Sequence, residues 1–384
     1  MNHELTTVAG QPSWRLSTAE VEAFVTRRGG QLGPVTFHRN ERAISPYALA
    51  PWAEEETDPQ LPPMLKVLRG DFFCLPFGDN STPYRGETHP PHGETANALW
   101  QFKAREESDG RSTLRLELQL QARPGHVEKA ITLRAGHNAV YSRHTVSGLN
   151  GPMNFGHHAM LQFPDIEGSG LISTSDFRFG QVFPGQFEDP LQGGHFSLMP
   201  GAQFETLDHV PLLAGGTTDL SRYPARRGYE DLVMLIGDEA SPFAWTAVSF
   251  PEQGYVWFAL KDPRVLRQTI LWMSNGGRPY APWNGRHFNV LGLEEVTSYF
   301  HFGLAEAVKP NPLSERGIPT HLEFDAAAPL VVNYITAVAP VPTTFGRLRA
   351  IEPFGADKVK LIAESGASVT TNIELEFLNE THGF

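Results

Sequence analysis

Cysteine is almost absent from this sequence, since Cys74 is the single one in 384 residues. One cysteine can form neither an intrachain disulfide nor a cysteine-rich zinc site, and it is compatible with a reducing compartment. We expect Cys74 to be a small core residue. Long apolar runs are missing too, because no window approaches the roughly 18 uninterrupted apolar residues of a membrane-spanning helix. Residues 1–11 lack the basic and apolar segments of a secretion signal, so the sequence predicts a cytoplasmic protein without a membrane partner.

Positive charge is scarce, with 31 Lys and Arg against 43 Asp and Glu and a formal net charge of -12. No block of basic residues could follow a phosphate backbone, and nucleic acid is therefore not an expected partner. The sequence also lacks a phosphate-binding loop, a dinucleotide fingerprint, a nucleophile elbow and an HExxH motif. These absences argue against nucleotides, nicotinamide cofactors and serine hydrolase chemistry.

Turn-forming residues are abundant, with 36 Gly and 31 Pro, which favours short elements joined by turns. Between Thr113 and Gln121, four leucines alternate with charged or amide residues, as in a half-buried strand. Residues 129–133 and 139–146 follow after turns and complete an antiparallel meander. Further strand-like runs rich in β-branched and aromatic residues occupy 232–237, 243–250, 255–260, 268–273, 331–338 and 369–377. The pattern predicts an all-β protein.

The N-terminal region gives two conflicting local signals. Residues 17–20 have the form of a helix capping box, but Gly29-Gly30 between two β-forming arms favours a hairpin of residues 21–25 and 32–37. We prefer the hairpin, and we expect residues 50–63 to form an exposed loop. Without a repeat or an obvious linker, the chain is predicted to be one domain over 1–384, with a core at about 17–345, a short N-terminal tail and C-terminal strands.

The densest polar cluster is HPPHGE, which contains His89, His92 and Glu94. Its spacing fits neither a helix face nor one strand face. We expect loop chemistry and no metal, because histidines in a proline-stiffened loop more often bond nearby carbonyls. A metal-dependent enzyme that adds a distant ligand such as His157 or His195 remains the less favoured alternative.

Two pairs of adjacent residues could contribute acid–base groups. Because neighbours on a strand point to opposite faces, only one of His157 and His158 can face a given pocket. One of Glu294 and Glu295 must likewise face the apolar side, where desolvation raises a carboxyl pKa toward the range of a general base. The alternative is that one glutamate pairs with an arginine such as Arg286 and the other is solvated.

Several other residues could bind a sugar. Aromatic rings stack on sugar faces, although most aromatics at strand spacing are core residues; the candidates are Trp272, Trp283, Tyr280 and Trp100. Arg69 could hold an anion or a ring hydroxyl, or form a surface salt bridge.

The order of these motifs along residues 21–302 resembles the galactose mutarotase-like superfamily, which includes aldose 1-epimerases and hexose-6-phosphate epimerase relatives. The matching pieces are the hairpin with Gly29-Gly30, RGDFFCLPFG at 69–78, His92-Gly93, Gly156-His157-His158 and Gly292-Leu293-Glu294. The resemblance implies a large twisted antiparallel β-supersandwich, which agrees with the all-β prediction.

The resemblance also implies site residues. Glu294 is implied as the general base and His158 as the general acid. His92 is implied as a substrate-orienting donor and Arg69 as a further binding group. The register alternatives are His157 for His158 and Glu295 for Glu294. Additional substrate-binding residues are expected at His89, His157, Asn97 and Trp283, and a mid-chain acid stays unassigned among Asp208, Asp219 and Asp231.

This combination predicts an aldose 1-epimerase, which opens and recloses a cyclic aldose with one base and one acid. The partner is then a small-molecule sugar, and the mechanism requires neither a cofactor nor a metal. In the sugar-phosphate epimerases an arginine follows the HG pair by three, whereas this chain has Ala96, which disfavours a phosphorylated substrate. The alternative is a non-catalytic carbohydrate-binding protein on the same fold, and exposed edge strands could support a homodimer.

Overall fold

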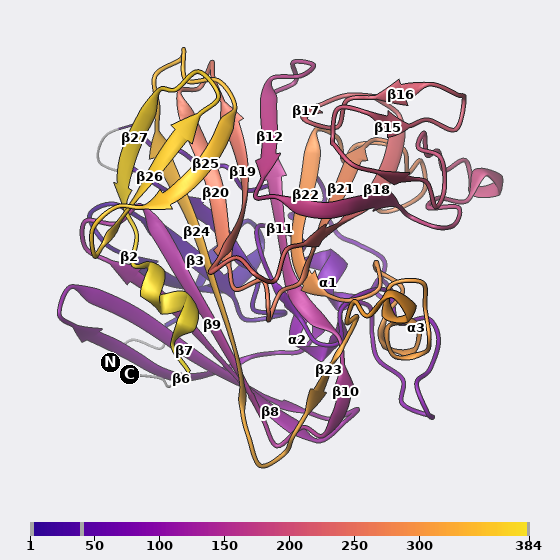
Figure 1. The fold of residues 1–384 in the computed structure, drawn as a ribbon. Helices are drawn as coiled ribbons and strands as arrows, with labels where there is room; N and C mark the ends of the chain where they lie inside the picture. The colour runs from indigo at the N-terminus through magenta and orange to yellow at the C-terminus, as the bar shows by residue number, and fades with distance from the viewer. Residues whose placement is uncertain (1–3, 39–41, 382–384) are drawn as a thin grey trace.

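Two large antiparallel sheets dominate the computed structural model of the chain, which describes residues 4–38 and 42–381 (Figure 1). The seven-stranded sheet has the order β14 (Gln203–Phe204), β13 (Phe177–Val182), β18 (Tyr229–Gly237), β21 (Gln268–Asn275), β22 (Val290–Thr297), β11 (Phe155–Gln162), β5 (Phe73–Cys74). The nine-stranded sheet has the order β17 (Arg222–Tyr223), β12 (Gly170–Thr174), β19 (Ala244–Phe250), β20 (Tyr255–Lys261), β24 (Leu330–Pro340), β9 (Ala139–Ser147), β8 (Gly125–Arg134), β7 (Arg111–Leu120), β6 (Gln101–Ser108).

Smaller elements surround these sheets. A four-stranded sheet contains β1 (Thr6–Val8), β2 (Gln11–Ser17), β3 (Glu22–Thr26) and β4 (Leu32–Thr36), and a three-stranded sheet contains β25 (Leu348–Pro353), β26 (Lys358–Ala363) and β27 (Ser368–Asn372). Two ribbons pair β10 (Gly151–Met153) with β23 (Leu322–Phe324) and β15 (Val210–Pro211) with β16 (Thr217–Thr218). The helices are short: α1 (Pro63–Lys66), α2 (Gly93–Asn97), α3 (Leu304–Val308), η1 (Pro190–Gln192), η2 (Ser314–Arg316) and η3 (Leu375–Asn379). Within the described ranges, no helix has the length and apolar character needed to cross a membrane.

The main core lies between the two large sheets. Side chains on a strand alternate between its two faces, so every second residue of a strand can enter this core. In β22, Leu291 and Leu293 enter this core, whereas Val290 and Val296 join a second apolar cluster on the outer face of the same sheet. Tyr334 of β24 enters the main core from the opposite sheet. Both faces of the seven-stranded sheet are therefore covered, which explains why β11, β21 and β22 are buried along almost their whole length.

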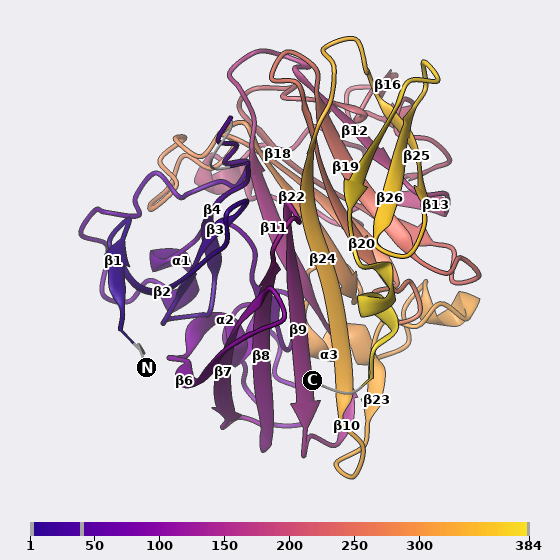
Figure 2. The same ribbon diagram turned by 90° about the vertical axis from the view of Figure 1, so that its left-hand side faces the viewer.

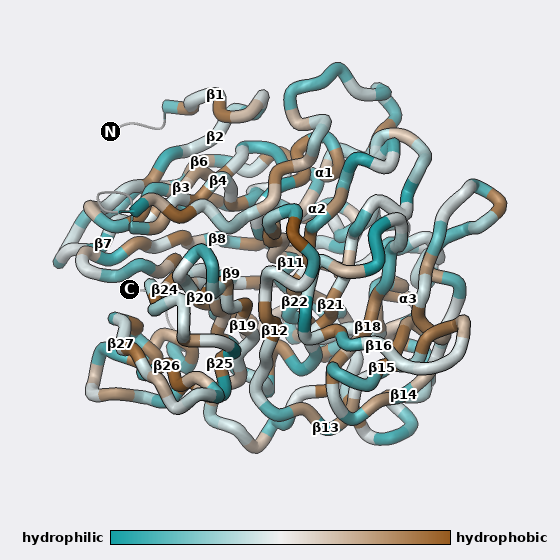
Figure 3. The backbone as a smooth tube through the Cα atoms, turned by 90° about the horizontal axis from the view of Figure 1, so that it is seen from above, coloured by the Kyte–Doolittle hydropathy of each residue, from teal (hydrophilic) through white to brown (hydrophobic). Residues whose placement is uncertain are grey.

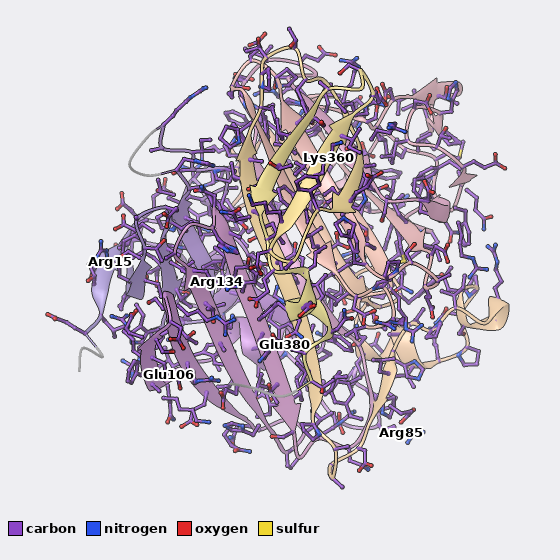
Figure 4. The ribbon with its side chains drawn as sticks, turned by 60° about the vertical axis from the view of Figure 1, so that its left-hand side comes forward. Arg15, Arg85, Glu106, Arg134, Lys360 and Glu380 are labelled. Carbon is purple, nitrogen blue, oxygen red and sulfur yellow. The ribbon has the colours of Figure 1, made fainter. Side chains whose placement is uncertain are left out.

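The C-terminal sheet covers the outer face of the nine-stranded sheet. Leu361 of β26 packs in one cluster with Phe258 of β20 and Ile335 of β24. Figures 2 and 3 show β25, β26 and β27 beside β19, β20 and β24. In Figure 4, Lys360 marks β26 and Glu380 lies over the large sheet, where its carboxylate pairs with Arg143.

The all-β prediction is confirmed, and the meander at 113–146 corresponds to β7, β8 and β9. The prediction was wrong in three places. The expected N-terminal tail forms β1 and β2, the last strand ends at Asn372, and a short helix begins at Gly93 inside HPPHGE. The predicted hairpin is present as β3 and β4. The residues of the capping-box signal lie at the turn between β2 and β3, in which Thr18 Oγ1 accepts hydrogen bonds from the amides of Glu20 and Val21.

A buried ion pair links the two large sheets. The Glu295 carboxylate on β22 pairs with the Lys261 ammonium on β20, and their side chains are 1% and 3% exposed. Thr269 Oγ1 donates to the same carboxylate at 2.7 Å, and Lys261 Nζ donates to the carbonyl of Gln268 at 3.0 Å. The expectation that one of the paired glutamates is solvated is therefore wrong, and Arg286 pairs with Glu55 instead.

Replacing Glu295 with Gln is expected to lower the free energy of unfolding by about 3–5 kcal/mol, because the Lys261 ammonium would be left buried without its counterion. Denaturant unfolding at neutral pH measures this change. Glu55→Gln is the control, since it removes the exposed pair with Arg286 and should leave the unfolding midpoint unchanged. Equal midpoints for the two variants would contradict a structural role for the buried pair.

Candidate active site

A cavity of about 240 Å³ opens on the outer face of the seven-stranded sheet. Its polar lining residues are Asp79, His92, His158, Arg278, Glu294 and His301. The remaining wall is apolar or aromatic and consists of Met64, Leu65, Leu68, Pro91, Phe187, Leu232, Trp272, Tyr280 and Trp283. A concave, mostly apolar pocket with a few convergent polar groups is typical of a small-molecule site.

His158 and Glu294 form the centre of this cavity. They are directly opposite each other on the antiparallel strands β11 and β22, so both side chains point to the same face. His158 Nε2 lies 3.3 Å from Glu294 Oε1, and the two side chains are 5% and 3% exposed. A Cβ atom on Gly292 would lie 2.9 Å from Glu294 Oε1, which is why the residue two before the glutamate has no side chain.

His92 joins this pair from a different segment. It precedes α2 with a left-handed φ of 57°, and its ring centroid lies 5.0 Å from that of His158. Its Nδ1 lies 3.4 Å from Cys74 Sγ, and burial raises the pKa of the Cys74 thiol well above its usual value. A protonated thiol that donates to Nδ1 leaves the ring proton on Nε2, where it can serve as a donor.

Burial also controls the protonation of the acid–base pair. It raises the pKa of Glu294 well above the usual carboxyl value, with the nearby Arg278 opposing the shift. It lowers the pKa of His158 to about 4 and that of His92 well below its usual value. Both shifts disfavour the charged forms, the carboxylate of Glu294 and the imidazolium of His158.

Asp71 supports His158 from the other side of the sheet. Asp71 Oδ1 accepts a hydrogen bond from the backbone amide of His158 at 3.1 Å, and Oδ2 lies 2.9 Å from His157 Nδ1. The carboxylate raises the pKa of His158, against the larger lowering by burial. Sequence reasoning missed Asp71, although it lies within the RGD of the motif at 69–78.

Arg278 forms another part of the cavity wall. Its Nε donates to Glu188 Oε1 at 2.7 Å, and its guanidinium centre lies 4.6 Å from the centroid of the Trp283 ring. His301 also lines the cavity, and its Nδ1 has no hydrogen-bond partner among the described residues. Both residues follow the ends of strands, β21 and β22, and only that position could have indicated them from the sequence.

Six of the candidate residues line this cavity, namely His92, His158, Glu294, Trp272, Tyr280 and Trp283. His157 points into the main core, where its ring stacks on Tyr334 at 4.3 Å between centroids. Trp100 is fully buried and donates to the carbonyl of Thr95. Adjacent strand residues thus face opposite sides, as the sequence predicts.

Two other expected binding residues have structural contacts. The Arg69 guanidinium donates to the carbonyls of Val67, Val8 and Ala9 at 2.8–3.0 Å, and it does not line the cavity. Asn97 accepts from the amide of Met64 at 3.0 Å and donates to the carbonyls of Pro91 and Gly93 at 2.7 Å. The Arg69 contacts stabilise the turn at Val8 and Ala9, and the Asn97 contacts connect α2 with α1.

The histidine cluster at 89–94 does not converge on one point. His89 Nε2 contacts Glu87 at 3.2 Å, and Glu94 accepts from the amides of Gln121 and Ala122 at 3.0 Å. The ring of His195 lies beside Tyr229. Among residues 4–38 and 42–381, no group of three or more His, Cys, Asp or Glu side chains could hold a metal ion.

None of the three mid-chain acids lines the cavity. Asp208 is exposed beside His209, Asp219 accepts from the amide of Ser221, and Asp231 binds the amides of Ser197 and Leu198. Glu230 was not among the candidates. It lies on the cavity side of β18, where it accepts a hydrogen bond from Trp272 Nε1 at 3.0 Å.

Comparison with known proteins supports the fold at low sequence identity. No protein-family model and no curated protein sequence matches the chain. A galactose mutarotase-like protein from Clostridium acetobutylicum superposes with a TM-score of 0.56 and 12% identity, over 88% of this chain and 100% of that one. A candidate aldose 1-epimerase from Escherichia coli K12 gives 0.56 and 14%, over 86% and 99%.

A galactose mutarotase related enzyme from Lactobacillus acidophilus gives a TM-score of 0.54 and 10% identity, over 86% of this chain and 98% of that chain. The three structures are thus covered almost completely by this chain. Together with the two large antiparallel sheets, they show that the chain has the galactose mutarotase-like fold, which the order of its motifs predicts.

Proposed function

We propose that this protein is an aldose 1-epimerase-like isomerase, which interconverts the α and β anomers of a sugar by acid–base ring opening. The observation that carries the proposal is the buried contact between His158 Nε2 and Glu294 Oε1 in the wall of the cavity. Two groups of opposite role, held by adjacent strands, suit a reaction that moves two protons on one substrate.

The geometry matches the chemistry of an anomeric centre. The hydroxyl oxygen O1 and the ring oxygen O5 are both bonded to C1, so they lie side by side, as the two protein atoms do. Glu294 as carboxylate takes the proton from O1, and His158 as imidazolium gives a proton to O5 while the C1–O5 bond breaks. Rotation about C1–C2 and the reverse transfers close the ring on the other face of the aldehyde.

The proton count of the pair is the same throughout. Before ring opening, the pair is carboxylate and imidazolium, and after ring opening it is carboxylic acid and neutral imidazole. Burial favours the second form, because it raises the pKa of Glu294 and lowers that of His158. At ring closure the reverse transfers return one proton from Glu294 to O1 and one from O5 to His158, which restores carboxylate and imidazolium, so the cycle needs no proton from solvent.

The other lining residues have supporting roles in this scheme. The Trp272 and Trp283 rings meet nearly at right angles with centroids 5.9 Å apart, and they offer apolar surface to the C–H face of a sugar ring. His92, neutral because of its lowered pKa, can orient a hydroxyl by hydrogen bonding without adding charge.

Glu294→Gln is expected to lower kcat/KM for anomer exchange by about 10²–10⁴-fold, because an amide cannot accept the O1 proton. Polarimetry or saturation-transfer NMR with a panel of aldoses measures the rate above buffer. Glu295→Gln, assayed below its unfolding transition, should keep the wild-type rate per folded molecule. Full activity in Glu294→Gln would refute the role of this glutamate, and sugar binding without anomer exchange in the wild type would indicate a carbohydrate-binding protein.

Asp71→Asn tests the role of the Asp71 carboxylate, which accepts a hydrogen bond from the His158 amide and raises the pKa of the His158 ring. Activity requires the one-proton state of the pair, so the acid limb of the wild-type pH–rate profile should lie near the His158 pKa of about 4. Without the Asp71 carboxylate the imidazolium is less stable, so this limb should move to lower pH. The plateau rate should fall by up to roughly tenfold, since one pKa unit corresponds to a factor of ten. A reduced rate with an unmoved limb would mean that Asp71 has only a structural role.

A further inference from the structure

Arg278 is the single Lys or Arg side chain that lines the cavity among the described residues. A cation in such a place would ordinarily indicate an anionic substrate, because guanidinium groups bind phosphate and carboxylate in a bidentate manner. Whether Arg278 can do so depends on what else its nitrogens contact.

Two buried carboxylates already hold this guanidinium. Arg278 Nε and Nη2 lie 2.7 and 2.6 Å from Glu188 Oε1, and Nε lies 4.0 Å from Glu230 Oε2. The side chains of Glu188 and Glu230 are 3% and 1% exposed. Burial by itself would lower the pKa of Arg278, but the two glutamates raise it above its usual value, so the charge is present and compensated.

Neighbouring donors fix both carboxylates in place. Tyr280 Oη donates to Glu188 Oε2 at 2.5 Å. Glu230 accepts from Trp272 Nε1 and from Ser274 Oγ, each at 3.0 Å. A ligand that needed the Arg278 charge would have to displace Glu188 from this network and leave its carboxylate buried and unpaired, which is costly.

Aromatic rings also pack against the guanidinium of Arg278, whose side chain is 16% exposed. Its central carbon lies 4.6 Å from the Trp283 centroid, 5.3 Å from that of Trp272 and 5.7 Å from that of Phe187. These distances are within the range of cation–π contacts. Arg278 therefore contributes to an aromatic wall and is not left open as an anion receptor.

We propose that Glu188 is a specificity-determining residue, and that by occupying Arg278 it restricts the cavity to uncharged aldoses and excludes sugars that carry phosphate or carboxylate. A sugar phosphate would bring a charge of about −1.5 to −2 into a cavity whose lining cation, Arg278, is already paired with Glu188. A charge that enters a desolvated site without a counterion of its own is strongly disfavoured, which discriminates against the wrong ligand. This inference names the substrate class of the proposed function and rests on it.

The first experiment measures binding and exchange separately for matched pairs of ligands. Saturation-transfer NMR with wild-type protein compares aldohexoses and aldopentoses with their terminal phosphates and with hexuronic acids. We expect binding and anomer exchange with at least one uncharged aldose, and at least roughly a hundredfold lower kcat/KM with its charged counterpart. Preferential exchange of a phosphorylated or acidic sugar would overturn the inference and leave the proposed function intact.

Glu188→Gln tests the assigned residue. This change removes the carboxylate that bonds Arg278 directly and leaves only Glu230, at 4.0 Å, to offset the charge of Arg278. The affinity for the 6-phosphate of an aldohexose should then rise by roughly tenfold or more. The double variant Glu188→Gln with Arg278→Gln should lose this gain. Glu22→Gln, which removes the exposed pair with Arg15 far from the cavity, is the matched control and should behave as wild type.

The outcomes separate the two proposals. Selective binding of uncharged aldoses without anomer exchange would refute the proposed function and support the selectivity. A folded Glu188→Gln variant that gains no affinity for the sugar phosphate would overturn the role of Glu188. Circular dichroism establishes folding, and if this variant does not fold, the ligand panel with wild-type protein decides the inference. Absence of binding by every sugar in the panel would overturn both.

Discussion

The site depends on one constraint, which is that β22 is buried on both of its faces while it carries two adjacent glutamates. Because neighbouring side chains on a strand point in opposite directions, Glu294 faces the cavity and Glu295 faces the core between the sheets. Each buried carboxylate needs a partner that offsets the loss of its hydration. Glu295 has the Lys261 ammonium and two threonine hydroxyls, whereas Glu294 has the His158 imidazole.

The two partners, the Lys261 ammonium and the His158 imidazole, have different chemical consequences. An ammonium keeps its partner ionised and fixed, so the Glu295 pair holds the sheets together without offering a proton. An imidazole can accept and return a proton, and burial opposes charge on both partners, which favours the neutral form of each. The same strand therefore provides a buried ion pair on one face and, on the other, the pair that we propose to transfer protons.

The structural relatives share the scaffold and leave the substrate open, since identities of 10–14% show the fold alone. What distinguishes this chain lies in the residues placed on that scaffold. Asp71 supports His158 through the sheet, and Glu188 and Glu230 hold Arg278 within an aromatic wall. In our proposals, these contacts influence the protonation of the His158–Glu294 pair and the class of ligand that the cavity accepts.

Much of the fold could be predicted from local sequence, because alternation of apolar and polar residues, β-branched runs and Gly-Gly turns act over a few residues. The order of the motifs also indicated His92, His158 and Glu294, which the structure places in one cavity. Local pattern failed where the decisive contact is distant in sequence. The helix capping signal at residues 17–20 lies at the turn between β2 and β3, and these two strands pair with each other over residues 13–17 and 22–26.

The sequence by itself determined the all-β class, the positions of most strands and the alternation that separates His157 from His158 and Glu294 from Glu295. Only the tertiary structure decided which member of each pair meets the cavity, since a one-residue shift in register would exchange the faces. It also decided that Arg69 and Asn97 have structural contacts and that Arg278, His301 and Asp79 line the cavity. The physical reason is that binding roles depend on which atoms remain unpaired after folding, and pairing is settled by segments that lie far apart along the chain.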